Sequence, residues 1–183
     1  MNYASIKTCD IANGPGVRVS LFVSGCTHHC EGCFNAVAWD FDYGEPFTEQ
    51  VEQGLLDALR PAYIRGLTLL GGEPMEPVNQ VALLPFLRRI RRELPSKSIW
   101  CYSGYTWEEL TGQTPSRCRQ DTTDELLSLL DVLVDGPYVA SKRDLMLRFR
   151  GSSNQRILDV PRSLASGAPQ LWQDVPAYAQ HGR

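Results

Sequence analysis

The stretch from residue 17 to residue 33 reads VRVSLFVSGCTHHCEGC and combines a strand pattern with a group of thiols. Its first part, Val17–Ser24, is rich in β-branched and aromatic residues and follows a turn at Asn13–Gly16, which predicts a β-strand. Its second part, Gly25–Cys33, places three cysteines at the spacing C-x3-C-x2-C on the loop directly after that strand. The stretch therefore predicts a strand whose carboxyl end carries a metal-binding loop.

Helix and strand patterns alternate after the cysteine loop. Thr48 is placed to cap a helix whose apolar side chains share one face, and Pro61 ends that helix. Residues 66–70 form the next expected strand, which leads into Gly71–Pro74. An amphipathic helix follows, and Pro85 must kink or restart it. The apolar positions of this helix are Val81, Leu84, Leu87, Ile90 and Leu94.

The second half of the chain continues the alternation. A third strand is expected at Ser98–Ser103. Thr106 and Glu109 stand three residues apart and predict a capping box at the start of a helix. Thr122 and Glu125 repeat this signal and predict a second helix of the same kind.

The expected strands and helices favour a mostly parallel sheet. Val132–Val134 is the fourth strand. In such a sheet the loops after the strands gather at one edge and build the active site. Because only four or five strand signals occur, we expect an α/β fold with a partial (β/α) barrel, smaller than a full eight-unit barrel. The loops that would meet at the edge are the cysteine loop, Gly71–Pro74, Ser103–Tyr105 and Asp135–Pro137.

Length and composition limit the class of protein. A chain of 183 residues fits one domain, which we place at residues 1–160, with a loosely attached tail at 161–183. The formal net charge of −3 gives no electrostatic reason to expect nucleic acid or an anionic membrane as a partner. The start of the chain lacks a signal-peptide pattern, and no apolar run approaches the ~18 residues that span a bilayer. We therefore expect a cytoplasmic protein.

Cysteine placement favours a metal cluster over a disulfide framework. Three of the six cysteines lie between residues 26 and 33, whereas Cys9, Cys101 and Cys118 are scattered. Three thiolates so close together can each take one corner of a cubane iron–sulfur cluster, and the absence of a nearby fourth cysteine leaves one iron without a protein ligand. Cys101, within an expected strand, is interpreted as a buried small side chain.

A zinc site is the alternative for the cysteine loop. His28, His29 or Cys9 could complete four ligands around zinc. Zinc sites usually come as two ligand pairs separated by a longer stretch, and the sequence has no second pair of that kind. The cluster is therefore favoured, and His28 and His29 are interpreted as solvated loop residues.

The cysteine loop GCTHHCEGC together with GGEP at residues 71–74 resembles the radical S-adenosylmethionine superfamily. Further segments are similar to the activating enzymes of anaerobic ribonucleotide reductases, and the resemblance covers roughly residues 1–158. These segments are DIANGPG at residues 10–16, LFVSGC at 21–26, VLVDGPY at 132–138 and RGSSNQ at 150–155.

The resemblance implies a fold, a chemistry and partners. The fold would be the partial barrel of the superfamily, and Cys26, Cys30 and Cys33 would bind a [4Fe-4S] cluster whose open iron chelates S-adenosylmethionine. Reductive cleavage of S-adenosylmethionine would give a 5′-deoxyadenosyl radical that abstracts hydrogen from a glycine of the reductase. An external electron donor, flavodoxin or ferredoxin, would supply the electron.

Other residues are candidates for contacts with S-adenosylmethionine. Gly71, Gly72 and Glu73 resemble the family's loop at the methionine amino group, although a tight turn is the alternative. Gly32 stands where many superfamily members have an aromatic residue, and Phe34 could replace that residue against adenine. One further candidate, at the end of the fourth strand, is Asp135, which could instead cap the turn into Gly136–Pro137.

The sequence leaves alternatives open for the roles of two segments and for the function. Residues 150–155 could order the partner's glycine loop or form a structural turn. The arginines at residues 88–92 are interpreted as a solvated helix face. Other possible functions are a pyruvate formate-lyase activase, a radical S-adenosylmethionine enzyme for a small molecule, and a noncatalytic zinc-binding module. The short chain favours a protein substrate, because little sequence remains to enclose a small one.

Overall fold

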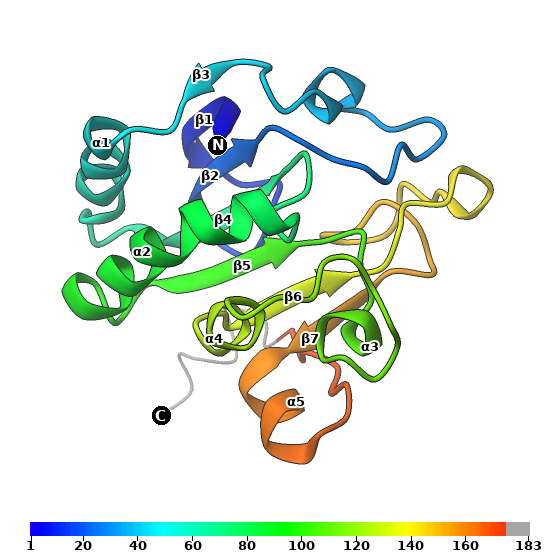
Figure 1. Cartoon of the computed structure of the whole chain (residues 1–183). Helices are drawn as coiled ribbons and strands as arrows, with labels where there is room; N and C mark the ends of the chain where they lie inside the picture. The colour runs from blue at the N-terminus through cyan, green and yellow to red at the C-terminus, as the bar shows by residue number, and fades with distance from the viewer. Residues whose placement is uncertain (175–183) are drawn as a thin grey trace.

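The computed structural model describes residues 1–174 and contains a seven-stranded sheet covered by helices (Figure 1). The strands are β1 (Asn2–Asp10), β2 (Val17–Val23), β3 (Glu45–Pro46), β4 (Ile64–Gly71), β5 (Ser98–Tyr102), β6 (Val132–Asp135) and β7 (Arg156–Asp159). The α-helices are α1 (Glu49–Leu59), α2 (Pro77–Glu93), α3 (Trp107–Leu110), α4 (Thr123–Ser128) and α5 (Val160–Ser166). Two short 3-10 helices, η1 (Ala36–Trp39) and η2 (Ala140–Lys142), lie in loops.

The centre of the sheet is parallel and its margins are antiparallel. The strand order is β3-β1-β2-β4-β5-β6-β7. The pairs β2 with β4, β4 with β5 and β5 with β6 are parallel, whereas β1, β3 and β7 pair antiparallel with their neighbours. The expected α/β class with its parallel strands is confirmed. The described residues form an open sheet with β3 and β7 at its edges, so the expected barrel is not confirmed.

The antiparallel strands were missed because their sequences carry little apolar signal. Strand β1, NYASIKTCD, is mostly half-exposed or exposed, and β3 has two exposed residues. Strand β7 has four residues, of which only Leu158 is buried. Each depends on a neighbour far along the chain for its backbone hydrogen bonds, and sequence patterns do not report such partners.

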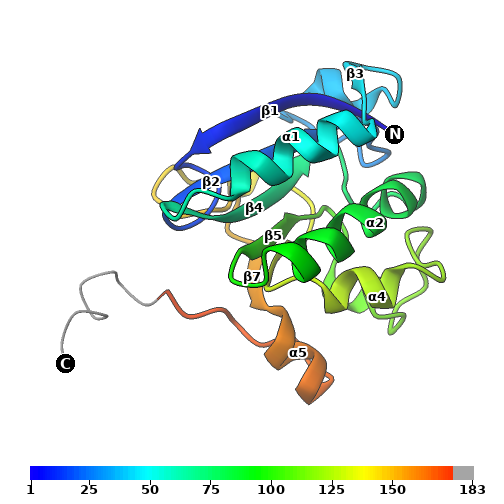
Figure 2. The ribbon, with the colours of Figure 1, turned by 90° about the vertical axis from the view of Figure 1, so that its left-hand side faces the viewer.

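Three helices cover one face of the sheet and form the main core (Figure 2). Apolar side chains of α1, α2 and α4 pack there on β2, β4 and β5. Buried members include Leu56, Leu67, Phe86, Leu87, Ile99 and Leu126. Among the described residues, none of the helices is both long enough and apolar enough to cross a membrane.

Two of the three predicted helix caps are confirmed and one is wrong. Thr48 caps α1 as predicted, and Thr106 with Glu109 forms both bonds of the predicted capping box. The second predicted box is wrong, because Thr122 has a helical backbone and its side chain makes no capping bond. Pro85 lies inside the continuous helix α2, so the helix does not restart there.

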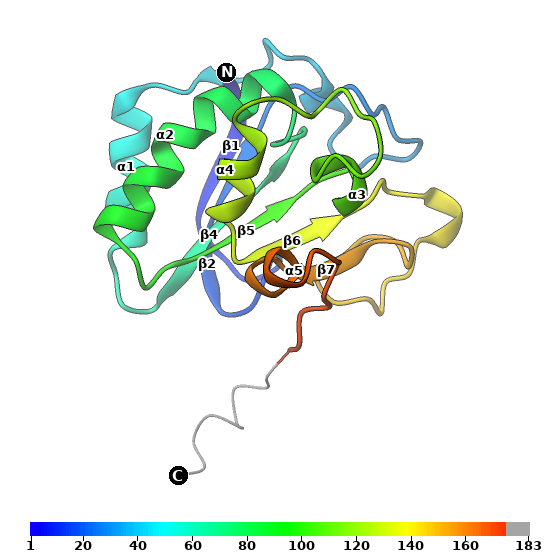
Figure 3. The ribbon, with the colours of Figure 1, turned by 60° about the horizontal axis from the view of Figure 1, so that its bottom comes forward.

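The last part of the described chain returns to the sheet. Helix α5 begins at Val160, beside β7 (Figure 3), and Leu171 then forms an antiparallel bridge with Leu158. The expected tail at 161–183 thus has structure up to residue 174, and its residues 175–183 lie outside the described residues. The division of the chain at residue 160 stays a prediction.

A buried arginine ties three strands together on the face opposite the main core. Arg18 of β2 is fully buried beneath the Trp100 ring, 5.5 Å from its centroid. Its guanidinium group donates to Thr68 Oγ1 at 2.7 Å, to the Leu67 carbonyl at 2.6 Å and to Ser98 Oγ at 2.9 Å. Burial lowers the pKa of Arg18 to about 10, so the side chain stays charged at neutral pH and depends on these acceptors.

Replacing Arg18 with alanine is expected to lower the free energy of unfolding by about 2–5 kcal/mol, because it opens a cavity and removes the donors for four acceptors, the carbonyl of Ser98 being the fourth. Urea unfolding followed by circular dichroism measures this change. Arg65→Ala, an exposed arginine of β4, is the control and should change the free energy by less than about 0.5 kcal/mol. Equal effects of the two changes would contradict the role of Arg18.

Candidate active site

The parallel strands end at one edge of the sheet, and the loops that carry the candidate residues meet there (Figure 1). Val23 at the end of β2 pairs with Gly71 at the end of β4, and Tyr102 of β5 pairs with Val134 of β6. The cysteine loop after β2 therefore lies next to the loop Gly71–Pro74 at the end of β4, called the glycine loop below. The sequence prediction that these loops share one edge is confirmed.

The cysteine loop is fixed by backbone hydrogen bonds to η1. The Gly25 amide donates to the Ala38 carbonyl at 2.9 Å, and the Cys26 amide donates to the Trp39 carbonyl at 3.1 Å. Within the loop, the Cys33 amide donates to the Cys30 carbonyl at 3.1 Å. These contacts hold the three cysteines on a compact loop, with Cys26 buried and the other two half-buried.

Burial disfavours the thiolate form of two of the cysteines, Cys26 and Cys30. Burial raises the pKa of the Cys26 thiol to about 12, and burial also raises the pKa of Cys30. A metal centre binds thiolates, so its binding has to displace these protons.

The glycine loop approaches the cysteine loop closely. The Gly72 amide donates to the Val23 carbonyl at 2.7 Å, and the Glu73 amide donates to the Gly25 carbonyl at 2.8 Å. Gly71 has a φ of +110°, and a Cβ atom on Gly72 would lie 2.6 Å from the Gly25 oxygen. Only glycine fits both positions without a shift of the backbone.

The Glu73 carboxylate joins three loops and is almost fully buried. Its Oε2 atom lies 3.0 Å from His28 Nε2 and accepts from the Gly104 amide at 2.6 Å. Its Oε1 atom accepts from the Met75 amide at 2.8 Å. The interpretation of His28 as a solvated residue is wrong, because this ring is 16% exposed and contacts both Glu73 and the Tyr105 ring. Sequence reasoning missed the pair, since 45 residues separate its members.

A second buried glutamate supports the cysteine loop from below. Glu76 Oε1 accepts from both the amide and the hydroxyl of Thr27, and the Tyr105 hydroxyl lies 3.3 Å from the same oxygen. Arg117 donates to that hydroxyl at 2.8 Å. This chain of contacts had no signal in the sequence beyond the glutamate of GGEPMEP, at residues 71–77.

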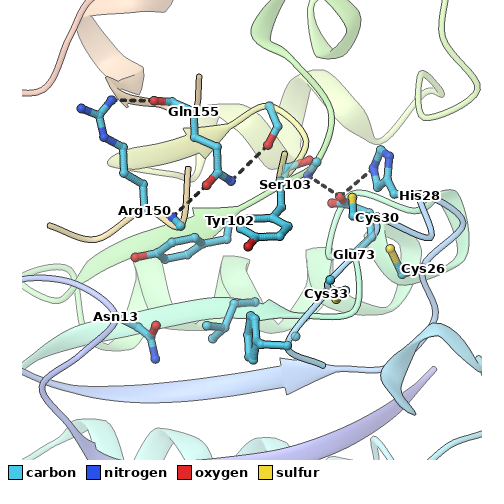
Figure 4. Close-up of a pocket in the computed structure, with 18 of the residues that line it drawn as sticks. Asn13, Cys26, His28, Cys30, Cys33, Glu73, Tyr102, Ser103, Arg150 and Gln155 are labelled. Carbon is cyan, nitrogen blue, oxygen red and sulfur yellow. Dashed lines mark hydrogen bonds and ion pairs between the residues drawn. The ribbon is translucent and has the colours of Figure 1, made fainter. Parts of the chain in front are cut away.

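A cavity of about 550 Å³ opens between these loops. Figure 4 shows the cysteines, His28 and Glu73 at one end, and Arg150 with Gln155 at the other. Tyr102 and Ser103 lie between the two ends. Its volume is within the usual range for sites that bind cofactor-sized molecules.

The donor set fits a four-iron cluster. Cys26, Cys30 and Cys33 all line the cavity. In residues 1–174, no three His, Cys, Asp or Glu side chains surround one point as a single metal ion requires. A cubane cluster places each thiolate on a different iron, so it does not require that convergence, whereas a zinc ion does.

Of the other residues predicted to contact S-adenosylmethionine, two line the cavity and one does not. Gly32 and Phe34 line the cavity, and Phe34 is 82% exposed. Asp135 is buried outside the cavity lining. Its carboxylate accepts from the Trp107 amide at 2.7 Å and from Arg156 Nε at 3.0 Å. The structure thus brings Gly32 and Phe34 to the cavity but directs Asp135 into an ion pair beneath it.

The segment at residues 150–155 is a turn that also borders the cavity. Gln155 Oε1 accepts from the Gly151 amide at 2.9 Å and from the Ser152 amide at 3.1 Å. Arg150 donates to the Gln155 carbonyl at 2.6 Å, and both residues line the cavity. The two sequence interpretations, a turn and a binding element, are compatible in this geometry.

Comparisons with known proteins agree with this site. The 4Fe-4S single cluster domain family matches residues 12–158, which include the cysteine loop, the glycine loop and residues 150–155. The fold and the site therefore define an iron–sulfur protein of the single-cluster class. Cys26, Cys30 and Cys33 are the residues we predict to bind the cluster.

Curated relatives carry one common name. The anaerobic ribonucleoside-triphosphate reductase-activating protein of Pasteurella multocida is 45% identical over 159 residues, which is 86% of this chain and 96% of the relative. Its namesake in Escherichia coli strain K12 is 41% identical over 157 residues, covering 85% and 96%. The one in Enterobacteria phage T4 is 39% identical over 157 residues, covering 86% and 93%. The chain belongs to the family of anaerobic ribonucleoside-triphosphate reductase-activating proteins.

Gly72→Ala is expected to lower the free energy of unfolding by about 1–3 kcal/mol, because the added Cβ meets the Gly25 carbonyl and pushes the two loops apart. Gly54→Ala is the matched control, since Gly54 lies in α1 with nothing within 4 Å of the added atom. That change should raise the free energy of unfolding by about 0.5–1 kcal/mol. Chemical denaturation of both variants makes the comparison, and a stabilising Gly72→Ala would contradict the close approach.

Proposed function

We propose that this protein activates an anaerobic ribonucleotide reductase by generating a glycyl radical on it, with a [4Fe-4S] cluster and S-adenosylmethionine. The observation that carries the proposal is the placement of the three-cysteine loop against the Gly71–Glu73 loop at one end of a single cavity. The shared name of the relatives supports the choice of the reductase as partner. The partial barrel typical of radical S-adenosylmethionine enzymes is part of the same proposal.

The cysteine end of the cavity binds the cluster and S-adenosylmethionine in this proposal. When bound, the cluster supplies the electron that cleaves S-adenosylmethionine reductively. Cys26, Cys30 and Cys33 hold the cluster, and the backbone of Gly71 and Gly72 borders the place for the methionine end of S-adenosylmethionine. Phe34 lies at the rim of the same end, where an adenine ring can pack on it.

Glu73 acts mainly by holding its neighbours in place. Both of its oxygens already accept hydrogen bonds from the protein, so it fixes His28 of the cysteine loop and Gly104 after β5 at set distances. This arrangement keeps the cysteine loop, the glycine loop and the Ser103–Tyr105 loop in one geometry before the ligand arrives, which lowers the free-energy cost of binding.

The far end of the cavity suits a segment of the partner protein. Asn13, Tyr102 and Arg150 border this end, and they offer amide, hydroxyl and guanidinium groups to a peptide backbone. Leu145 also lines the cavity and is 83% exposed, so an apolar side chain open to solvent borders the cavity. This openness favours a protein substrate over a small molecule.

The electron has to come from outside the chain. We assign flavodoxin or ferredoxin as the donor class, because cleavage of a sulfonium requires a low-potential one-electron reductant. A zinc-binding module would need converging ligands on one ion, which the described residues do not provide. A pyruvate formate-lyase activase would use the same kind of cavity. The two functions differ in the protein substrate, which is the reductase in this proposal.

Anaerobic reconstitution, reduction and addition of S-adenosylmethionine with an anaerobic ribonucleotide reductase should give a glycyl radical doublet in the electron paramagnetic resonance spectrum. Cys30→Ala should abolish the doublet, because it removes one cluster ligand. Cys9→Ala is the control, since Cys9 is exposed on β1 and outside the cavity. Release of 5′-deoxyadenosine without a doublet would contradict the partner, and the absence of both in a cluster-loaded sample would contradict the whole proposal.

Glu73→Gln is expected to weaken S-adenosylmethionine binding by at least about tenfold, because an amide group cannot accept all three hydrogen bonds that the carboxylate accepts. Iron and sulfide content should stay close to that of the wild type, since the glutamate is not a cluster ligand. Equilibrium binding to the reconstituted protein measures the affinity. An unchanged affinity would show that the carboxylate does not set the loop geometry.

A further inference from the structure

Phe149 and Arg150 form a wall between two cavities. On one side they line the main cavity that carries the cysteines. On the other side they line a smaller cavity of about 320 Å³, together with Ile157 and Trp172. The position of this wall therefore sets the shape of the end of the main cavity that lies opposite the cysteines.

The wall does not hold its conformation by itself. Phe149 has a φ of +57°, in the left-handed region that disfavours residues with a side chain. Such a conformation persists only where surrounding contacts determine it. The contacts around Phe149 therefore decide whether the wall stays in place.

Trp172 supplies contacts from behind the wall. The rings of Phe149, Trp100 and Trp172 form an edge-to-face cluster. The centroid of Trp172 lies 5.0 Å from that of Trp100 and 6.5 Å from that of Phe149, and Trp100 and Phe149 are 5.6 Å apart. Trp172 does not line the main cavity, so it acts on the wall and not on a ligand there.

The segment that carries Trp172 is anchored to β7 and to the wall. The Trp172 amide donates to the Ile157 carbonyl at 2.9 Å, and the Asp159 amide donates to the Gln170 carbonyl at 2.9 Å. Asp174 forms an ion pair with Arg148, the residue directly before Phe149. The segment is thus bound at both of its ends.

This support comes from a part of the chain beyond the family match, which ends at residue 158. The wall residues lie inside the matched region, and residues 170–174 lie outside it. The contacts of Trp172 and Asp174 to the wall and its neighbours therefore come from residues outside the matched range.

We propose that residues 170–174 brace the Phe149–Arg150 wall, with Trp172 as the positioning residue, and so set how well the cavity accepts the glycine segment of the protein substrate. This inference rests on the proposed function and adds a determinant of partner recognition to it. The brace acts on the partner's segment alone, because the cysteines and Glu73 lie at the opposite end of the cavity (Figure 4).

The test is the kinetics of glycyl radical formation at varied reductase concentration, with the full-length, cluster-loaded protein. Trp172→Ala should raise the KM for the reductase about tenfold and leave kcat within about twofold, because the aromatic contacts of Trp172 to Phe149 of the wall and to Trp100 behind it are lost. Trp172→Phe should restore most of the KM. Leu164→Ala is the control, since Leu164 is 42% exposed on α5 and lines neither cavity, and its KM should equal that of the wild type.

A second variant and a second readout separate positioning from folding. Asp174→Asn keeps the aromatic cluster and weakens only the pair with Arg148, so a rise of about two- to threefold in KM is expected. Release of 5′-deoxyadenosine without the reductase should match the wild type in Trp172→Ala, because the cluster end is untouched.

Two outcomes overturn the inference. One is an unchanged KM in Trp172→Ala. The other is a loss of iron and of 5′-deoxyadenosine release in Trp172→Ala together with an unchanged KM in Asp174→Asn, which would assign a folding role to the tryptophan. A wild-type protein that forms no glycyl radical overturns the proposed function itself, and the wild-type measurement alone identifies that failure.

Discussion

The contact between the ends of β2 and β4 determines where everything else at the site lies. Two amides after β4, those of Gly72 and Glu73, donate to carbonyl oxygens at the end of β2 and at the start of the cysteine loop. The approach is so close that a single Cβ atom on Gly72 would collide with the Gly25 carbonyl. Because the loops touch through their backbones, the start of the cysteine loop and Glu73 lie next to each other. The parallel register of the two strands is what makes this contact possible.

Buried charged groups extend this arrangement in two directions. On the side of the cysteines, Glu73 and Glu76 each gather donors from several loops, and neither faces open solvent. On the face of the sheet opposite the main core, Arg18 joins β2, β4 and β5 through acceptors on neighbouring strands. Groups of this kind are costly to bury unless each of their hydrogen bonds is made. They therefore favour one arrangement of strands and loops over alternatives that would leave a partner unsatisfied.

The sequence was sufficient for the features that local patterns encode. The apolar run of β2, the thiol spacing after it, the caps of α1 and α3, and the turn into the glycine loop all follow from neighbouring residues. The features that the sequence did not predict depend on partners far along the chain. Strand β1 is defined by β2, and the pairing of His28 with Glu73 spans 45 residues. The burial of Asp135 follows from Arg156, which the sequence places on no recognisable element. The open sheet likewise depends on pairings at its edges that no local pattern records.

The cavity draws its lining from Ala12 at one end of the chain to Gln155 near the other. A site of this kind has no local precursor, because its loops come together only after the whole central sheet has formed. The parts of the site are also synthesised at different times, because they lie far apart in the chain. A chain still emerging from the ribosome presents the three thiols on an unsupported loop, and the opposite wall is added almost last. The complete cavity, with the cysteine loop at one end and residues 150–155 at the other, therefore exists only after the chain has been synthesised beyond Gln155.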